Sequence, residues 1–443
     1  MFLTPDGPDN KERLVTKQRC CHLEQPNMST RTKHILSRHD SPTDTDIADL
    51  VDALAIDAIA AGSSDIHIEP WDKSLVVRFR LNGVLKEFEH LPLELAERIS
   101  ARLKVMANLV NYETEKPQEG HARVSTESGG VELRLSFFPV VRSGEGSSFS
   151  RGEKIVIRIF DPSSRSFELE KLGFDEETAA SVIDLLNRPT GMLLLTGPTG
   201  SGKTTAIYAA LCHLVKQHGS SISISTVEDP VEYNLPQISQ AQINHSREFT
   251  YPIALRSLMR QDPQVIMIGE IRDPETAAIA VQAGLTGHLV ISTIHSGSTA
   301  GVFARMINMD IEPFLLASSI VGILGLRLVR NNCPLCSMPY QPDDVLLKRV
   351  PESAISDASW RRGGGCETCN HTGFAGRTAL AEMLVVNEPI RDAIMEKTRT
   401  RKLQAIAQAQ GMKTLWETGI ERATSGEIPI EEILRSVTED PLT

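Results

Sequence analysis

The sequence predicts an α/β protein, in which a large part with a mostly parallel sheet follows a smaller α+β part. Two patterns predict this fold class. From about residue 172, short apolar segments alternate with longer helical segments, as in a parallel sheet covered by helices. Before that point, segments with period-two alternation follow one amphipathic helix. A length of 443 residues also allows two or three hydrophobic cores.

The composition indicates a soluble globular protein, with 41% apolar and 23% charged residues. A net charge of -11 disfavours broad electrostatic binding to nucleic acid, so we expect no direct nucleic-acid partner. The apolar runs are far shorter than the roughly 20 residues of a membrane span. The first residues also lack an apolar segment behind a basic start. We therefore expect a cytoplasmic protein.

The first part of the chain is expected to hold a tail and a small domain. Residues 1–45 are polar and aperiodic, which predicts a flexible tail. Residues 46–161 are predicted to form the small α+β domain, with a helix that ends at Gly62. Asn82-Gly83 is the strongest short hairpin signal, because both positions of a type I′ turn need positive φ. The strands are expected at 65–70, 75–81, 84–88, 131–138 and 154–160.

The remaining residues, 162–443, are predicted to form the α/β domain. Its expected strands are almost continuously apolar, which is typical of strands buried on both faces. They lie within the segments 191–197, 221–230, 264–273 and 287–295.

A phosphate-binding loop is expected at residues 197–204, GPTGSGKT. The flanking strand and helix make a chance match the weaker alternative. Backbone N–H groups of the glycine-rich loop can turn toward phosphate oxygens, and the helix N-terminus adds a positive field. Lys203 is expected to reach the β- and γ-phosphates, and the Thr204 hydroxyl to hold Mg²⁺. The expected ATP- or GTP-binding residues are Gly197, Pro198, Thr199, Gly200, Ser201, Gly202, Lys203, Thr204 and Thr205.

Carboxylates follow two of the expected strands. Glu270 stands where the run VIMI ends, and Glu228 and Asp229 follow another strand. Catalytic groups collect at the carboxyl ends of parallel strands, so Glu270 is expected to polarise the attacking water. Glu228 and Asp229 are expected to order Mg²⁺ and its waters. The alternative is that all three are ordinary loop residues.

Four cysteines form two CxxC pairs that predict a structural zinc site. The pairs are separated by 29 residues, and four thiolates make a closed tetrahedral Zn²⁺ site without an open catalytic position. Free buried thiols are the alternative. We assign no role to Cys20, Cys21 and Cys212. The expected zinc ligands are Cys333, Cys336, Cys366 and Cys369.

Taken together, these motifs resemble the secretion and pilus motor ATPase family, whose members drive type II secretion or type IV pilus movement. The resemblance covers about residues 46–443, and the four-cysteine module is typical of the secretion and pilus-extension members. Besides the phosphate loop and the cysteines, it rests on SSDIHIEPW (63–71), VEDPVEY (227–233), VIMIGEIRD (265–273) and TGHLVISTIHS (286–296).

The resemblance implies a PAS-like N-terminal domain joined to a RecA-like P-loop ATPase domain. Within the latter it implies a zinc module at 331–375 and a helical part at 376–443. It also implies a homohexamer with ATP at subunit boundaries. The implied partners are inner-membrane platform and docking proteins of a secretion or pilus system, which would hold the chain peripherally at the cytoplasmic face.

The resemblance further implies roles for individual side chains. His288 and His295 would sense the γ-phosphate, whereas the residues alone favour satisfied core histidines. Arg78, Arg80 and Arg134 would approach the phosphates when the two domains close, and a solvated strand face is the alternative.

Three positions depart from the family pattern. Asn82 replaces an Asp, His121 replaces an Arg with Arg123 nearby, and Gln264 replaces an Asp. The departures at Asn82 and His121 leave a nucleotide-gated scaffold with little hydrolysis open as an alternative function. A DNA-uptake or conjugation motor also stays open, because it uses the same ATPase chemistry with a different cargo.

Overall fold

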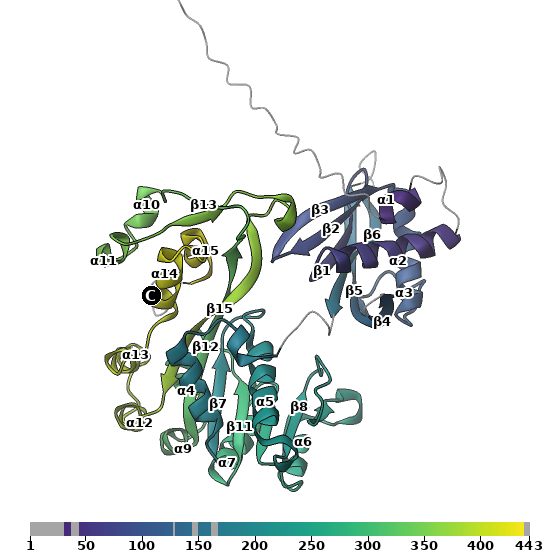
Figure 1. Ribbon diagram of the computed structural model, residues 1–443. Helices are drawn as coiled ribbons and strands as arrows, with labels where there is room; N and C mark the ends of the chain where they lie inside the picture. Colours follow the sequence, from purple (N-terminus) through teal and green to yellow (C-terminus); the bar gives the residue numbers. More distant parts are fainter. Residues whose placement is uncertain (1–30, 37–43, 127–128, 144–148, 161–166, 438–443) are drawn as a thin grey trace, which may run out of the picture.

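The structure is a computed structural model that describes residues 31–36, 44–126, 129–143, 149–160 and 167–437. It contains a six-stranded antiparallel sheet of order β3-β2-β1-β6-β5-β4 and a seven-stranded sheet of order β15-β12-β7-β11-β10-β8-β9. The two sheets form neighbouring parts of the molecule (Figure 1). The predicted combination of an α+β part and an α/β part is confirmed.

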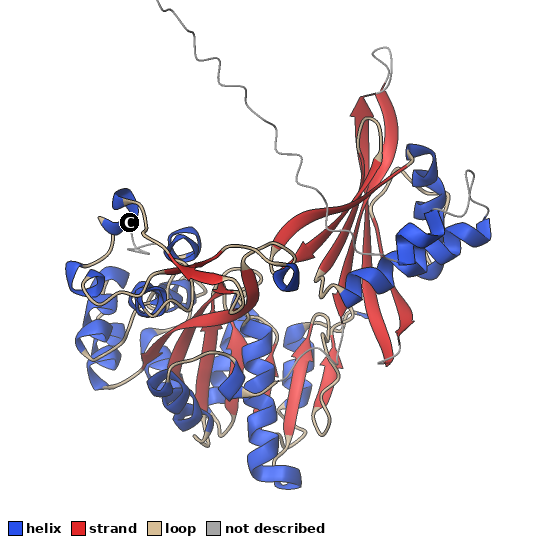
Figure 2. Cartoon of the chain, turned by 45° about the horizontal axis from the view of Figure 1, so that its top comes forward, coloured by secondary structure: helices blue, strands red, loops and turns tan. Residues whose placement is uncertain are grey.

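The N-terminal sheet buries one face under two helices, α2 (Asp44–Ala60) and α3 (Ala96–Met106) (Figure 2). Alternate residues decide which face is which, because successive strand side chains point to opposite sides. Val77 and Phe79 enter the core, whereas Arg78 and Arg80 lie on the other face. The strands are β1 (Asp65–Pro70), β2 (Leu75–Leu81), β3 (Val84–Leu91), β4 (Gln118–Thr126), β5 (Gly129–Ser143) and β6 (Phe149–Phe160).

Two turn predictions for this sheet are confirmed, and the tail prediction is partly wrong. Asn82 and Gly83 have φ of 48° and 81°, as the hairpin turn requires, and Gly62 at φ 69° follows α2. Residues 31–36 of the predicted tail form helix α1 (Arg31–Leu36). The Thr32 hydroxyl donates a hydrogen bond of 2.7 Å to Asp57 of α2, which holds α1 in place. Residues 1–30 of that tail lie outside the described residues.

The seven-stranded sheet is buried on both faces by helices. Met192 and Leu194 of β7 face one core and Leu193 and Leu195 face another. Helices α4 (Glu176–Leu186) and α5 (Lys203–His218) contribute to the second core. The first core is built with α6 (Tyr251–Leu258), α7 (Pro274–Leu285), α8 (Gly301–Ile307) and α9 (Pro313–Ser319). The strands are β7 (Gly191–Thr196), β8 (Ile224–Glu228), β9 (Ser239–Gln242), β10 (Val265–Ile268), β11 (Leu289–Thr293), β12 (Ile320–Asn332) and β15 (Phe374–Val385).

The prediction that residues 376–443 form a helical part is only partly right. Residues 374–385 form β15, which pairs antiparallel with β12, because the apolar run is buried beside that strand. Between β12 and β15 lie β13 (Ser337–Pro339), α10 (Asp344–Leu347), α11 (Glu352–Ile355) and β14 (Arg361–Gly363). After β15 follow α12 (Glu388–Met395), α13 (Thr400–Ala409), α14 (Leu415–Thr424) and α15 (Ile430–Ser436). In the described part of the chain, no helix combines the length and the apolar character needed to cross a membrane.

Candidate functional site

The predicted phosphate loop connects β7 to α5, in the strand–loop–helix order that the motif requires. Gly197, Gly200 and Gly202 have φ of 143°, 77° and 95°, a region that side-chain-bearing residues rarely adopt. A Cβ at Gly197 would also lie 2.5 Å from the carbonyl oxygen of Leu326. The glycines therefore allow the tight loop that turns backbone N–H groups toward an anion.

Polar groups of this loop are available to phosphate and metal. Lys203 Nζ donates to the carbonyl oxygens of Gly197 and Pro198, both at 2.8 Å. Burial, and then the charge of Arg327, lower the pKa of Lys203, while Glu270 opposes that shift. The Ser201 hydroxyl is buried and has no hydrogen-bond partner within the described residues. Thr204 is exposed on the first turn of α5, as a Mg²⁺ ligand must be.

The strands bring Glu270 and His295 to the same edge of the sheet as the phosphate loop. Strand β11 lies between β7 and β10, with Thr293 beside Leu195 and Ser292 beside Ile268. The ends of these three strands are therefore level. His295 Nε2 lies 3.7 Å from Glu270 Oε2. Lys203, Glu270 and His295 thus lie at the same edge of the seven-stranded sheet.

Arg272 is a further member of this group that sequence reasoning missed. Its guanidinium forms an ion pair with the half-buried Glu270 carboxylate. The hydrogen bond to Glu270 is the main cause that raises the pKa of Arg272. The spacing of two residues after Glu270 in GEIRD was the only signal, and it does not reveal which way either side chain turns.

Glu228 has a different environment from the one expected for a metal ligand. Its side chain is 2% exposed and accepts hydrogen bonds from Tyr208, Thr226 and, at 3.0 Å, Gln240. Burial and the hydrogen bond to Glu228 raise the pKa of Tyr208. Asp229, by contrast, is exposed and lies 3.1 Å from His245 Nε2. Glu228 is therefore committed to protein donors, and Asp229 faces solvent.

The structure does not bring His288 to the phosphate loop. His288 precedes β11, whereas the loop and His295 lie beyond the opposite ends of β7 and β11. Its Nδ1 lies 3.1 Å from the carbonyl oxygen of Ala283, and its own carbonyl accepts from Gly191 at 3.1 Å. Residues 289–294 lie between it and His295, and the five of them in β11 alone span roughly 16 Å at strand rise. His288 is therefore too far from the phosphate loop of its own chain to contact the γ-phosphate of a nucleotide bound there.

The three predicted arginines differ in their contacts. Arg78 pairs with Glu69 at 2.8 Å and Arg80 with Asp65 at 3.4 Å, so carboxylates of β1 hold both on the N-terminal sheet. Only Arg134 of these three crosses to the ATPase part. It donates to the carbonyl oxygen of Val231 at 3.2 Å and lies 3.3 Å from a Glu232 oxygen.

The departure at His121 and the nearby Arg123 lie on β4, on the same sheet face as Arg134. His121 is paired across the ladder with Arg134, and Arg123 with Glu132. His121 Nδ1 lies 3.2 Å from the Glu132 carboxylate, and both side chains are exposed. Arg123 therefore stands two residues along the same face from the position of His121. Gln264, the third departure, accepts from the N–H of Ser223 at 2.5 Å and joins β10 to β8.

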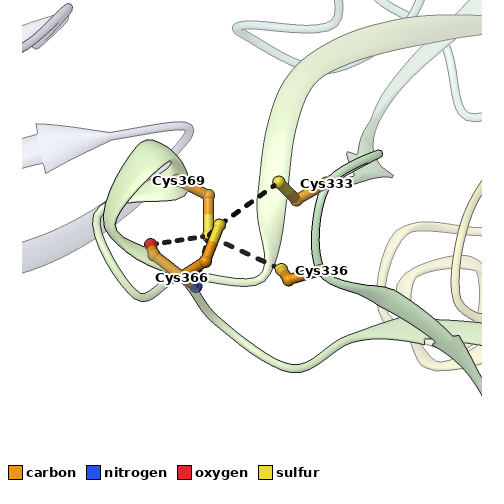
Figure 3. Close-up of side chains that lie close together, drawn as sticks. All are labelled: Cys333, Cys336, Cys366 and Cys369. Carbon is orange, nitrogen blue, oxygen red and sulfur yellow. Dashed lines mark hydrogen bonds between the residues drawn. The ribbon is translucent and has the colours of Figure 1, made fainter.

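The four predicted cysteine ligands converge from two loops (Figure 3). All four sulfur atoms lie within 4.8 Å of one another. The distances from Cys366 to Cys333 and to Cys369 are 3.9 and 3.8 Å, and Cys336 lies 3.9 Å from Cys369. A regular ZnS₄ tetrahedron with Zn–S of 2.3 Å has edges of about 3.8 Å. The residues present therefore fit a tetrahedral zinc ion.

Backbone N–H groups support thiolates in this cluster. Gly365 donates to Cys336 Sγ at 3.2 Å, and Cys366 and Gly373 donate to Cys369 Sγ at 3.2 and 3.3 Å. Burial raises the pKa of Cys369, but these two N–H groups and the adjacent thiols outweigh it and lower that pKa to about 6. Burial and the other thiols raise the pKa of Cys336 to about 11, because neighbouring thiolates oppose each other's ionisation.

The sheet order, the phosphate loop and the carboxylate at the neighbouring strand end define a P-loop ATPase with a RecA-like core, to which a smaller α+β part is attached. The chain belongs to the Type II/IV secretion system protein family, whose model matches residues 40–435. It is 40% identical over 403 residues to the type II secretion system protein E of Dickeya dadantii, covering 90% of this chain and 78% of that protein.

A second relative comes from a pilus system. The type IV pilus assembly ATPase PilB of Myxococcus xanthus is 38% identical over 413 residues, covering 92% of this chain and 71% of that protein. Among solved structures, the Legionella pneumophila ATPase DotB aligns with a TM-score of 0.64 at 18% identity, covering 87% of this chain and 94% of that chain. This structural similarity supports the RecA-like fold.

Proposed function

We propose that this chain is the motor of a type II secretion or type IV pilus system, in which a homohexamer hydrolyses ATP to drive pilus or pseudopilus assembly. The observation that carries the proposal is the meeting of Lys203, Glu270 and His295 at one sheet edge, within a chain of the secretion ATPase family. We also propose that the chain divides into residues 46–161 and 162–443, after a tail.

Each group at the loop has a proposed task. Lys203 steadies the β- and γ-phosphates, and the N–H groups of residues 197–205 bind their oxygens. Thr204 and Asp229 would hold Mg²⁺ and its waters, and the ion would supply positive charge that neutralises the phosphates. Glu270 orients and polarises the attacking water, while Arg272 and His295 position the Glu270 carboxylate.

Arginines of the N-terminal sheet complete the proposed site when the two parts close. Arg134 is supported most directly, because it already contacts Val231 and Glu232 beside Asp229. Arg78 and Arg80 would first have to exchange Glu69 and Asp65 for phosphate oxygens. Such arginines stabilise charge that develops in phosphoryl transfer, and are worth roughly 10³ to 10⁵ in rate.

Partners and the metal belong to the same proposal. Platform and docking proteins at the inner membrane would hold the hexamer at the cytoplasmic face. The relatives support a place in such a system, because they are named as a type II secretion system protein and a type IV pilus assembly ATPase. Zn²⁺ bound by the four cysteines would be structural, because four thiolates leave no coordination position for water. The net charge of -11 supports a protein partner rather than a nucleic-acid partner.

ATP turnover by the purified hexamer tests the proposal, because it distinguishes a motor from a nucleotide-gated scaffold with little hydrolysis. We expect Mg²⁺-dependent ATP hydrolysis by the wild type. Glu270→Gln should keep nucleotide binding while turnover falls by about 10² to 10⁴, because the base is lost and the phosphate loop is intact. Equal turnover in wild type and Glu270→Gln, or binding without turnover in both, would contradict the proposed mechanism.

A further inference from the structure

Two hydrogen bonds join the β2–β3 hairpin of the N-terminal sheet to the loop that carries two of the cysteines. Lys86 Nζ donates to the carbonyl oxygen of Asn370 at 2.5 Å, and Asn82 Nδ2 donates to that of Phe374 at 3.3 Å. We call residues 366–374 the cysteine loop. The hairpin end points toward this loop in the ribbon (Figure 1).

The two acceptor carbonyls are held in different ways. Asn370 follows Cys369 directly and has φ of 51° at the end of a single turn. Its orientation therefore depends on where Cys369 is held. Phe374 starts β15, and its ring lies 3.9 Å from the guanidinium carbon of Arg330, which is ion-paired to the buried Glu432. The Asn370 acceptor thus depends directly on the cysteine cluster. The Phe374 acceptor is anchored by the sheet and also accepts from Thr372 Oγ1 at 3.1 Å, so it depends on the cluster less directly.

Charge favours the same pairing. Zn²⁺ with four thiolates carries a net charge of about -2, since two positive charges meet four negative ones. The half-buried Lys86 ammonium, bonded to the residue after Cys369, would face this negative cluster. A cation beside a metal–thiolate group adds an interaction that the metal-free loop would lack.

We propose that the zinc-loaded cysteine loop is the docking surface for the chain's own β2–β3 hairpin, so that metal binding fixes the N-terminal sheet against the ATPase part. This inference rests on the zinc site proposed above. Lys86 is the contact that depends directly on zinc, and Asn82 is a second contact that the sheet anchors as well. An aspartate at position 82 would have no proton to donate to Phe374, so this contact needs the amide.

The same sheet carries Arg134, and this gives the docking a consequence for the nucleotide site. Hairpin docking holds one region of the N-terminal sheet, and Arg134 contacts Val231 and Glu232 from β5. Two separate anchors restrict how a sheet can turn against its neighbour. Loss of zinc would weaken the hairpin anchor and allow the arginine-bearing face to move more freely away from the segment after Asp229.

Hydrogen exchange of the hairpin tests the proposal, with the full chain at a concentration where it is monomeric. In the zinc-loaded protein, Lys86→Gln should speed exchange of amides 84–88 by about ten- to a hundred-fold, as expected for one lost hydrogen bond from a charged donor. Lys86→Arg should restore protection. Lys73→Gln is the matched control, because Lys73 is exposed in the β1–β2 turn of the same sheet.

The decisive comparison is between zinc-loaded and chelator-stripped protein. Stripping should speed hairpin exchange in the wild type, and the effect of Lys86→Gln should vanish in the stripped protein. Asn82→Asp should speed exchange by a similar factor in both forms. If stripping alters only residues 366–374 and leaves the hairpin unchanged, the docking proposal is wrong while the zinc site stands.

Two other results would also overturn it. Protein purified under reducing conditions without bound zinc would remove the metal on which the inference rests. Protection that appears only in the hexamer, and is lost in the monomer, would mean that the cysteine loop receives the hairpin of a second copy. Turnover by either form reports on the proposed ATPase separately from these outcomes.

Discussion

Removing the Tyr208 hydroxyl should weaken the core below the phosphate loop without removing a metal ligand. Tyr208 is fully buried on α5 and donates to the Glu228 carboxylate, which is 2% exposed. Tyr208→Phe keeps the ring and leaves this buried carboxylate with Thr226 and Gln240 as donors. One hydrogen bond to a charged group contributes about 1.5 to 3 kcal/mol, so we expect a loss of about 2 kcal/mol.

Hydrogen exchange of the β8 amides measures this loss locally, which avoids assuming that a chain of several parts unfolds in one step. Tyr340→Phe is the matched control: its hydroxyl donates to Glu431 at 2.9 Å, in a more exposed place, and should cost less than about 1 kcal/mol. Turnover should survive Tyr208→Phe. Unchanged β8 exchange together with lost Mg²⁺-dependent turnover would refute the assignment of Glu228 as a structural anchor.

Two further predictions concern the metal and pH. Cys366→Ser should lower the zinc content below one ion per chain and increase proteolysis between residues 337 and 365, while nucleotide affinity stays unchanged. Metal analysis measures the zinc content, and timed digestion measures the proteolysis. Unchanged protease resistance would count against the zinc site. Burial raises the pKa of Glu69, but Lys154 and Arg78 outweigh it and lower that pKa to about 2, from 4.5. Its contribution to stability is therefore full above pH 4.5 and is lost as pH falls toward 2. As pH falls from 4.5 toward 2, the denaturation midpoint of Glu69→Gln should fall less steeply than that of the wild type. Parallel pH dependences of the two midpoints would contradict this prediction.

Local patterns allowed the phosphate loop and the first hairpin to be predicted. GPTGSGKT needs its glycines for backbone reasons that hold in any context, and Asn82-Gly83 needs positive φ at both positions. Segments with weaker patterns were missed. β4 (Gln118–Thr126) is an edge strand of mostly polar residues in which only Ala122 and Val124 are buried, so its alternation carries few apolar positions. The apolar run of β15 was assigned to a helical part, because short apolar runs fit either structure.

Side-chain partners could not be predicted from the sequence for a different reason. The donors to Glu228 come from α5, β8 and β9, and the sequence does not show that they meet around one buried carboxylate. Lys86 and Asn370 are 284 residues apart, and no periodicity links them. Sequence patterns did predict which residue types lie at the strand ends, and the sheet order then decided that His295 meets Glu270 and His288 does not.

The most direct test of the proposed motor is ATP turnover measured across sedimentation fractions of the purified chain. ATP bound at subunit boundaries would link nucleotide binding to association, so hexamer should form more readily with ATP than without it. We expect Mg²⁺-dependent turnover to follow the hexamer fraction and to be lost in Glu270→Gln hexamers. A monomer at micromolar concentration that is indifferent to nucleotide, or turnover that is equal in wild type and Glu270→Gln, would contradict the account.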